Sequence, residues 1–264
     1  MATAIAERDF GPAAVHVSRA WRLFSEGIRH HPALHYYIGP YFIGPGGPLV
    51  LDPEHLQARL DPAFFGVFYW HWETSSTRDA EFLIKKQPLF FAHPGFKIWA
   101  RRGPNREREV GLEELQTMAA LWEKGARELE LAKRLVPPAQ RLRFRQEYIL
   151  GQHLACTWRS AAHVEEFLRL RDTVRQFSRS FSVRAGHVKE NLRDLERMTA
   201  IARAELEITR RDLALVKDAD FLDLSLRLDM ATASQADILR AKIKHTQHLL
   251  TKELPAWRKM LLTW

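Results

Sequence analysis

Glu73 carries the most distinctive chemistry in this sequence, because it directly follows the aromatic run Trp70-His71-Trp72. Residues 64–72 predict a β-strand, which places Glu73 at the C-terminal end of that strand. Aromatic rings stack on the apolar faces of sugars, and an apolar surrounding raises a carboxyl pKa, as a general acid requires. Glu73 is therefore the candidate catalytic residue of a sugar site. The alternative is a glutamate that makes a loop hydrogen bond or caps a helix, since a glycosidase uses two carboxylates.

Alternation along the predicted strand adds candidates for substrate binding. Successive side chains of a strand point to opposite faces, so Tyr69, His71 and Glu73 share one face, and Trp70 and Trp72 share the other. The first face would line a cleft, whereas the tryptophans would belong to the core. A second predicted strand at 34–43 could line the same cleft. The candidate substrate-binding residues are therefore His71, Tyr69, Tyr41, Tyr37 and His35.

The sequence predicts neither a metal site nor a cofactor. Its histidines follow no metal-ligand spacing such as His-Glu-x-x-His. The glycine- and proline-rich stretch at 44–48 lacks the lysine and hydroxyl residue that would follow in a phosphate-binding loop. Cys156 is the single cysteine, which excludes an internal disulfide, and its helical, aromatic-flanked setting predicts a buried small hydrophobic residue.

The elements that would position these residues fall into two unlike halves. Of 264 residues, the first 110 hold 10 of the 13 prolines and 18 of the 28 aromatic residues, which favours loops and short strands. Apolar residues at steps of three and four predict helices at 11–31, 111–136, 139–177, 187–217 and 235–252. The predicted fold is mainly α: an antiparallel helical bundle at 105–264, preceded at 1–104 by a small α/β region rich in aromatic residues.

The net charge of +8 does not predict nucleic-acid binding, because basic residues alternate with acidic ones along the predicted helices. That pattern is typical of solvated helix faces with i,i+4 pairs. Only the stretches 97–108 and 141–145 are locally basic. No stretch approaches about 18 apolar residues, so neither a membrane span nor a membrane partner is expected. A cytoplasmic location is expected unless an export signal lies upstream of this chain.

Several segments together resemble the C-terminal portion of large bacterial glycoside-hydrolase-like proteins, in which a catalytic barrel is followed by a helical domain. The segments that carry this resemblance are Ala20-Trp21-Arg22-Leu23-Phe24-Ser25-Glu26, Ile38-Gly39-Pro40, Trp122-Glu123-Lys124-Gly125, Phe167-Leu168-Arg169-Leu170-Arg171-Asp172, Ala202-Arg203-Ala204-Glu205-Leu206-Glu207 and Glu253-Leu254-Pro255-Ala256-Trp257-Arg258.

The resemblance implies a carbohydrate-active segment with only part of a barrel. An eight-unit barrel takes about 250 residues, whereas about 100 precede the predicted bundle. The segments 34–43 and 64–72 would be its last strands. This favours sugar binding, or completion of a barrel by a partner chain, over hydrolysis by this chain alone. The alternative is a non-enzymatic helical interaction module, a homo-oligomer or a binder of another protein, whose Trp257, Leu261 and Trp264 would be available for docking.

Overall fold

A computed structural model describes residues 2–31, 49, 51, 106–179, 187–217, 219 and 235–263. These residues are helical apart from short turns, and no strand occurs among them. The elements are α1 (Ala2–Phe10), the 3₁₀ turn η1 (Gly11–Ala13), α2 (Ala14–Arg29), α5 (Arg106–Ala132), the 3₁₀ turn η4 (Pro138–Gln140), α6 (Arg141–Arg179), α8 (Val188–Val216), α9 (Gln235–His248), the π-helical turn η6 (Leu249–Glu253) and α10 (Leu254–Leu262).

The predicted helical class is confirmed, but the small α/β region is not supported. The predicted strands at 34–43 and 64–72, and the domain boundary near residue 104, lie outside the described residues. What the structure describes of the first half is α1, η1 and α2, apart from Leu49 and Leu51. Nothing in the described part corresponds to a remnant of a barrel.

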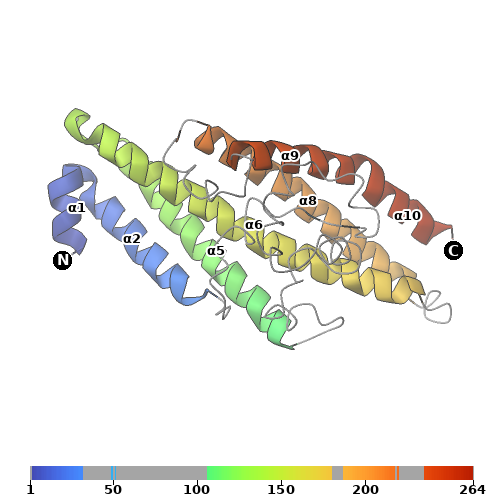
Figure 1. The fold of residues 1–264 in the computed structure, drawn as a ribbon. Helices are drawn as coiled ribbons and strands as arrows, with labels where there is room; N and C mark the ends of the chain where they lie inside the picture. The colour runs from blue at the N-terminus through green and yellow to red at the C-terminus, as the bar shows by residue number, and fades with distance from the viewer. Residues whose placement is uncertain are drawn as a thin grey trace, which may run out of the picture.

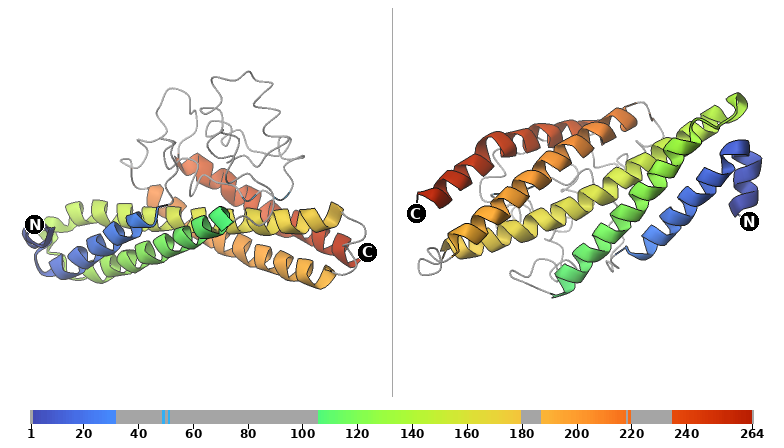
Figure 2. Two further views of the ribbon diagram at one scale, coloured as in Figure 1. Left: turned by 90° about the horizontal axis from the view of Figure 1, so that it is seen from below. Right: turned by 180° about the vertical axis from the view of Figure 1, so that it is seen from behind.

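The helices lie side by side in chain order, and each contacts the next (Figure 1). Polar pairs show that neighbours run antiparallel: His16 pairs with Glu128 and His30 with Glu114, so residue numbers rise along α2 as they fall along α5. The long helix α6 lies between α5 and α8 (Figure 2). It therefore joins a group formed by α2 and α5 to a group formed by α8 and α9.

The first group has an aromatic core that requires glycines. A Cβ atom on Gly125 of α5 would lie 2.3 Å from the ring of Phe24, and one on Gly151 of α6 would lie 2.5 Å from Leu129. The ring of Phe24 also stacks on Trp122, with ring centroids 4.3 Å apart. The absence of side chains at Gly125 and Gly151 therefore lets α2 pack closely against α5 and α6.

Burial identifies the side chains of the core. Trp122 and Trp158 are buried, and the predicted burial of Cys156 is confirmed. On α2, Val17, Ala20 and Phe24 are buried, as their helical spacing predicts. Ile28 continues the same spacing but is 50% exposed.

The helix predicted at 235–252 continues in the structure beyond Pro255. The π-helical turn η6 precedes it, and Pro255 occupies the first turn of α10, where its missing N–H breaks no helical hydrogen bond. Helix α10 packs on α8, and Leu261 is buried there rather than available for docking. Trp257 is partly buried, and Trp264 lies outside the described residues.

Candidate functional site: a buried polar network between three helices

The residues predicted to form a sugar site all lie outside the described residues. These are Glu73, the candidate catalytic residue, and the candidate substrate-binding residues His71, Tyr69, Tyr41, Tyr37 and His35. Their roles stay predictions.

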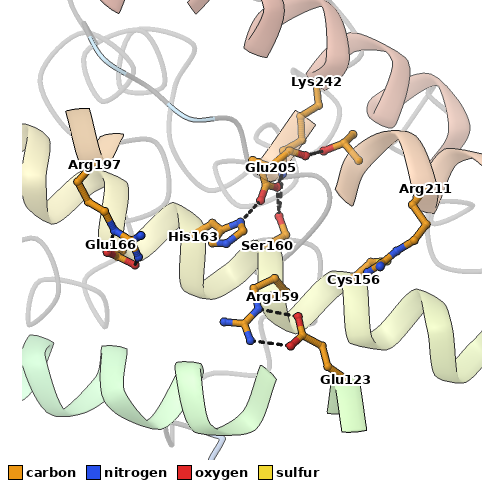
Figure 3. Close-up of polar contacts among 11 residues, drawn as sticks. Glu123, Cys156, Arg159, Ser160, His163, Glu166, Arg197, Glu205, Arg211 and Lys242 are labelled. Atoms are coloured by element: carbon orange, nitrogen blue, oxygen red, sulfur yellow. Dashed lines mark hydrogen bonds and ion pairs between the residues drawn. The ribbon is translucent and has the colours of Figure 1, made fainter. Parts of the chain in front are cut away.

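Four polar side chains from three helices meet in the interior at a place that the sequence analysis did not single out (Figure 3). Glu205 comes from α8, Lys242 from α9, and Ser160 and His163 from α6. Lys242 Nζ lies 2.8 Å from Ser160 Oγ, and His163 Nδ1 lies 2.8 Å from Glu205 Oε2. Lys242 and Ser160 both donate hydrogen bonds to Glu205 Oε1. Glu205, Lys242 and Ser160 are 0% exposed and are therefore closed to water, whereas the side chain of His163 is 14% exposed.

The charges in this network compensate one another. Burial opposes ionisation of Glu205, but the charge of Lys242 and the hydrogen bonds from His163 and Lys242 outweigh it and lower the pKa of Glu205 to about 2. Glu205 is therefore a carboxylate at neutral pH, with donors on both oxygens. Fully partnered groups of this kind lower the cost of placing charge in a protein interior.

A serine beside a lysine could in principle be a nucleophile with its general base. Such a serine must present its oxygen to a substrate and give its proton to the lysine. Here Ser160 donates its proton to Glu205, and Lys242 is itself ion-paired with that carboxylate. Both side chains are completely buried, so no substrate can reach them. The geometry fits the positioning of α6, α8 and α9 relative to one another.

Further polar contacts extend this network along α6 and α8. His153 Nδ1 lies 2.7 Å from Asp212 Oδ1, and Arg211 donates to Cys156 Sγ at 3.4 Å. Burial raises the pKa of the Cys156 thiol to about 12, helped by the charge of Asp212, so this cysteine is a hydrogen-bond acceptor and not a reactive thiolate. Both His153 and His163 thus bond to carboxylates of α8.

Charged pairs also join α5 to its neighbours, in addition to exposed i,i+3 pairs such as Lys133 with Glu130. Arg159 of α6 donates two hydrogen bonds to Glu123, at 2.7 and 2.8 Å. Burial opposes ionisation of Glu123, but these bonds outweigh it and lower the pKa of that carboxyl group. Glu114 and Glu128 pair with histidines of α2 in the same manner. Glu114, Glu123 and Glu128 therefore connect α5 to neighbouring helices.

The described residues include no group of three or more His, Cys, Asp or Glu side chains that could hold a metal ion. His163 and Glu205 provide only two such groups, and Lys242 occupies the other side of the carboxylate. A sequence signal for the network does exist in retrospect. Glu205 and Asp212 are seven residues apart, which places both on the same face of α8 as buried Met198 and Ile201.

Comparisons of this chain with protein-family models, with curated proteins and with solved structures found no match.

Proposed function

We propose that this chain is a carbohydrate-active, glycoside-hydrolase-like segment in which the helices hold a sugar-binding region in place. In this proposal the segment around Glu73 binds sugar, or completes a catalytic barrel together with another chain. The polar network keeps α6, α8 and α9 in register and takes no part in chemistry.

One contact carries the scaffold role. His245 Nε2 of α9 donates a hydrogen bond to the backbone oxygen of Leu49 at 2.8 Å. Leu49 and Leu51 are 0% and 1% exposed, so both side chains are fully packed. His245 lies one helical turn after Lys242, whose ammonium group is fixed by Glu205. The network therefore supports the part of α9 that binds the chain at Leu49, which lies in sequence between the predicted sugar-binding residues Tyr41 and Tyr69.

The test is titration of the purified chain with a panel of neutral and acidic oligosaccharides by calorimetry, together with hydrolysis assays on aryl glycosides. We expect binding that is lost in Glu73→Gln. The matched control is Glu207→Gln, which removes a carboxylate from the exposed face of α8, where it pairs with Arg210 of the same helix. This control should bind sugar as the unsubstituted chain does.

The same assays should be repeated with the product of the neighbouring upstream gene, because a completed barrel could require it. Absence of both binding and hydrolysis, with and without that product, would refute the proposal. Equal sugar binding by Glu73→Gln and the unsubstituted chain would also contradict it.

A second candidate function is a non-enzymatic helical interaction module. The observation that favours it is that Met260 and Leu262 of α10 are 39% and 62% exposed, at the end of a helix that otherwise packs on α8. Sedimentation analysis should then show an oligomer that Leu262→Gln dissociates. A monomer that Leu262→Gln leaves unchanged, without a partner in solution, would speak against this function.

A further inference from the structure

The connection between α5 and α6 has a one-sided charge. Residues 131–145, which we call the basic tip, contain five basic residues and no acidic one. All five basic side chains are exposed: Lys133, Arg134, Arg141, Arg143 and Arg145. Elsewhere along the described helices, acids and bases are mixed. The basic tip therefore holds a larger share of the net charge of +8 than an even distribution along the chain would give.

The basic tip also exposes large apolar side chains. Leu131, in the last turn of α5, is 53% exposed; Leu135, in the turn, is 44% exposed; and Leu142, in the first turn of α6, is 73% exposed. By contrast, Ala132, Val136 and Phe144 in the same stretch are buried. The apolar residues of the basic tip therefore form two sets. Ala132, Val136 and Phe144 are buried and stabilise the turn, whereas Leu131, Leu135 and Leu142 stay largely exposed.

The position of the basic tip leaves it accessible. Figures 1 and 2 show that the α5–α6 connection lies beside α1, at one end of the described helices along their axes. The end of α10 lies at the opposite end. Gly11 supports the tip from one side: its φ of +53° turns the chain between α1 and α2, and a Cβ there would lie 3.6 Å from Pro137. The exposed leucines of the basic tip therefore lie outside the buried core.

Ion pairs within the chain neutralise part of the positive charge of the basic tip. Arg143 pairs with Asp9 at 2.8 Å, and Lys133 lies 3.8 Å from Glu130. Arg134 and Arg141 make no ion pair with any of the described residues. Positive charge and exposed leucines therefore occur together at one end of the molecule.

We propose that the basic tip binds the surface of an anionic lipid bilayer. Lysine and arginine side chains are attracted to anionic headgroups, and leucines gain by entering the boundary between headgroups and acyl chains. A nucleic acid would satisfy the positive charges but would give the leucines no apolar partner. Contact with a bilayer surface differs from crossing a bilayer, and none of the described helices is long and apolar enough to cross one. This role is separate from sugar binding and does not depend on it.

The test is co-sedimentation of the full chain with phosphatidylcholine vesicles that contain or lack phosphatidylserine. We expect binding only with phosphatidylserine, and weaker binding at high salt. Because each cation contributes about fivefold to affinity, Arg134→Gln/Arg141→Gln should bind about 25-fold more weakly. Leu131→Gln/Leu142→Gln should also lose affinity while keeping its helical circular dichroism, since both side chains are exposed.

Matched controls lie away from the basic tip. Arg203→Gln removes an exposed cation from α8, and Ile28→Gln removes an exposed aliphatic side chain from the end of α2. Both should bind vesicles as the unsubstituted chain does. Three results would each overturn the proposal. They are equal binding to vesicles with and without phosphatidylserine, an equal loss of binding in the control variants, and binding to a homopolymeric RNA but to no vesicle.

Discussion

Lys242 Nζ and Ser160 Oγ lie 2.8 Å apart although 82 residues separate them in the chain, and both side chains are 0% exposed. Their common partner, Glu205, comes from a third helix. A shift of α9 along α6 would separate these groups and leave charge unpaired in the interior. The network therefore specifies one register for three helices, which apolar packing alone specifies less strictly.

Removal of one ion-pair partner should be more harmful than removal of both. Lys242→Met leaves Glu205 buried without its cation and should reduce the free energy of unfolding by about 3–5 kcal/mol. Lys242→Met/Glu205→Leu removes both charges and should recover most of that loss. Urea unfolding of the unsubstituted chain, of the single variants Lys242→Met and Glu205→Leu, and of the double variant measures the difference. Lys252→Met, at an exposed position of η6, is the control. A double variant that is as unstable as the sum of two single variants would show that the pair is not coupled.

Stability should fall in acid because of Glu205. Its folded pKa of about 2 lies below the ordinary value of 4.5 for a glutamate, so its stabilising contribution is complete above about pH 4.5 and is lost as the pH falls toward 2. The loss is on the order of 3 kcal/mol. Unfolding free energies measured across this range should show a shallower pH dependence in Lys242→Met/Glu205→Leu. Identical pH dependence in both proteins would assign the acid sensitivity to other carboxyl groups.

The Cys156 thiol should be inert in the folded protein. With a pKa of about 12 and a buried side chain, its thiolate fraction at mildly alkaline pH is about three orders of magnitude below that of a free thiol. Reaction with a thiol-specific reagent should therefore require unfolding. A comparison thiol is provided by Cys156→Ala/Ser25→Cys, because Ser25 is exposed on α2. Rapid labelling of native Cys156, at the rate of this comparison thiol, would contradict the prediction.

Gly125 should not tolerate a methyl group. Alanine is the better helix former by about 1 kcal/mol, but its Cβ would lie 2.3 Å from the Phe24 ring. Overpacking of this kind typically costs about 1–3 kcal/mol, so Gly125→Ala should lower the melting temperature. Ser25→Ala, at an exposed helical position, should not lower it. A more stable Gly125→Ala protein would mean that α2 can move away from α5 at little cost.

Helix positions were largely predictable because they depend on local patterns. Apolar spacing predicted helices at 139–177 and 187–217, close to the observed α6 and α8. Helix α1 was missed because Ala2–Phe10 contains few large apolar residues, and its burial of Phe10 depends on packing with α2. The continuation through η6 into α10 was missed because a proline signals a helix end unless the preceding turn adapts to it.

The polar network could not be predicted in the same way. A glutamate or a lysine in a helical sequence is ordinarily solvent-facing, so residue type argues against burial of Glu205 and Lys242, even though Glu205 shares the apolar face of α8 with Met198 and Ile201. Their contact depends on how α8 and α9 meet α6, which is a property of three segments distant in sequence. The predicted sugar-binding residues, with Glu73 foremost among them, are not tested by the described part of the chain.

The row arrangement of the helices has a consequence for the order in which this part of the molecule opens. Because each helix mainly contacts the next, local unfolding can begin at either edge without breaking the middle. Amide hydrogens of α1 and α10 should then exchange with solvent first. Those in the centre of α6, which has neighbours on both sides, should exchange last and report the global opening of the described helices.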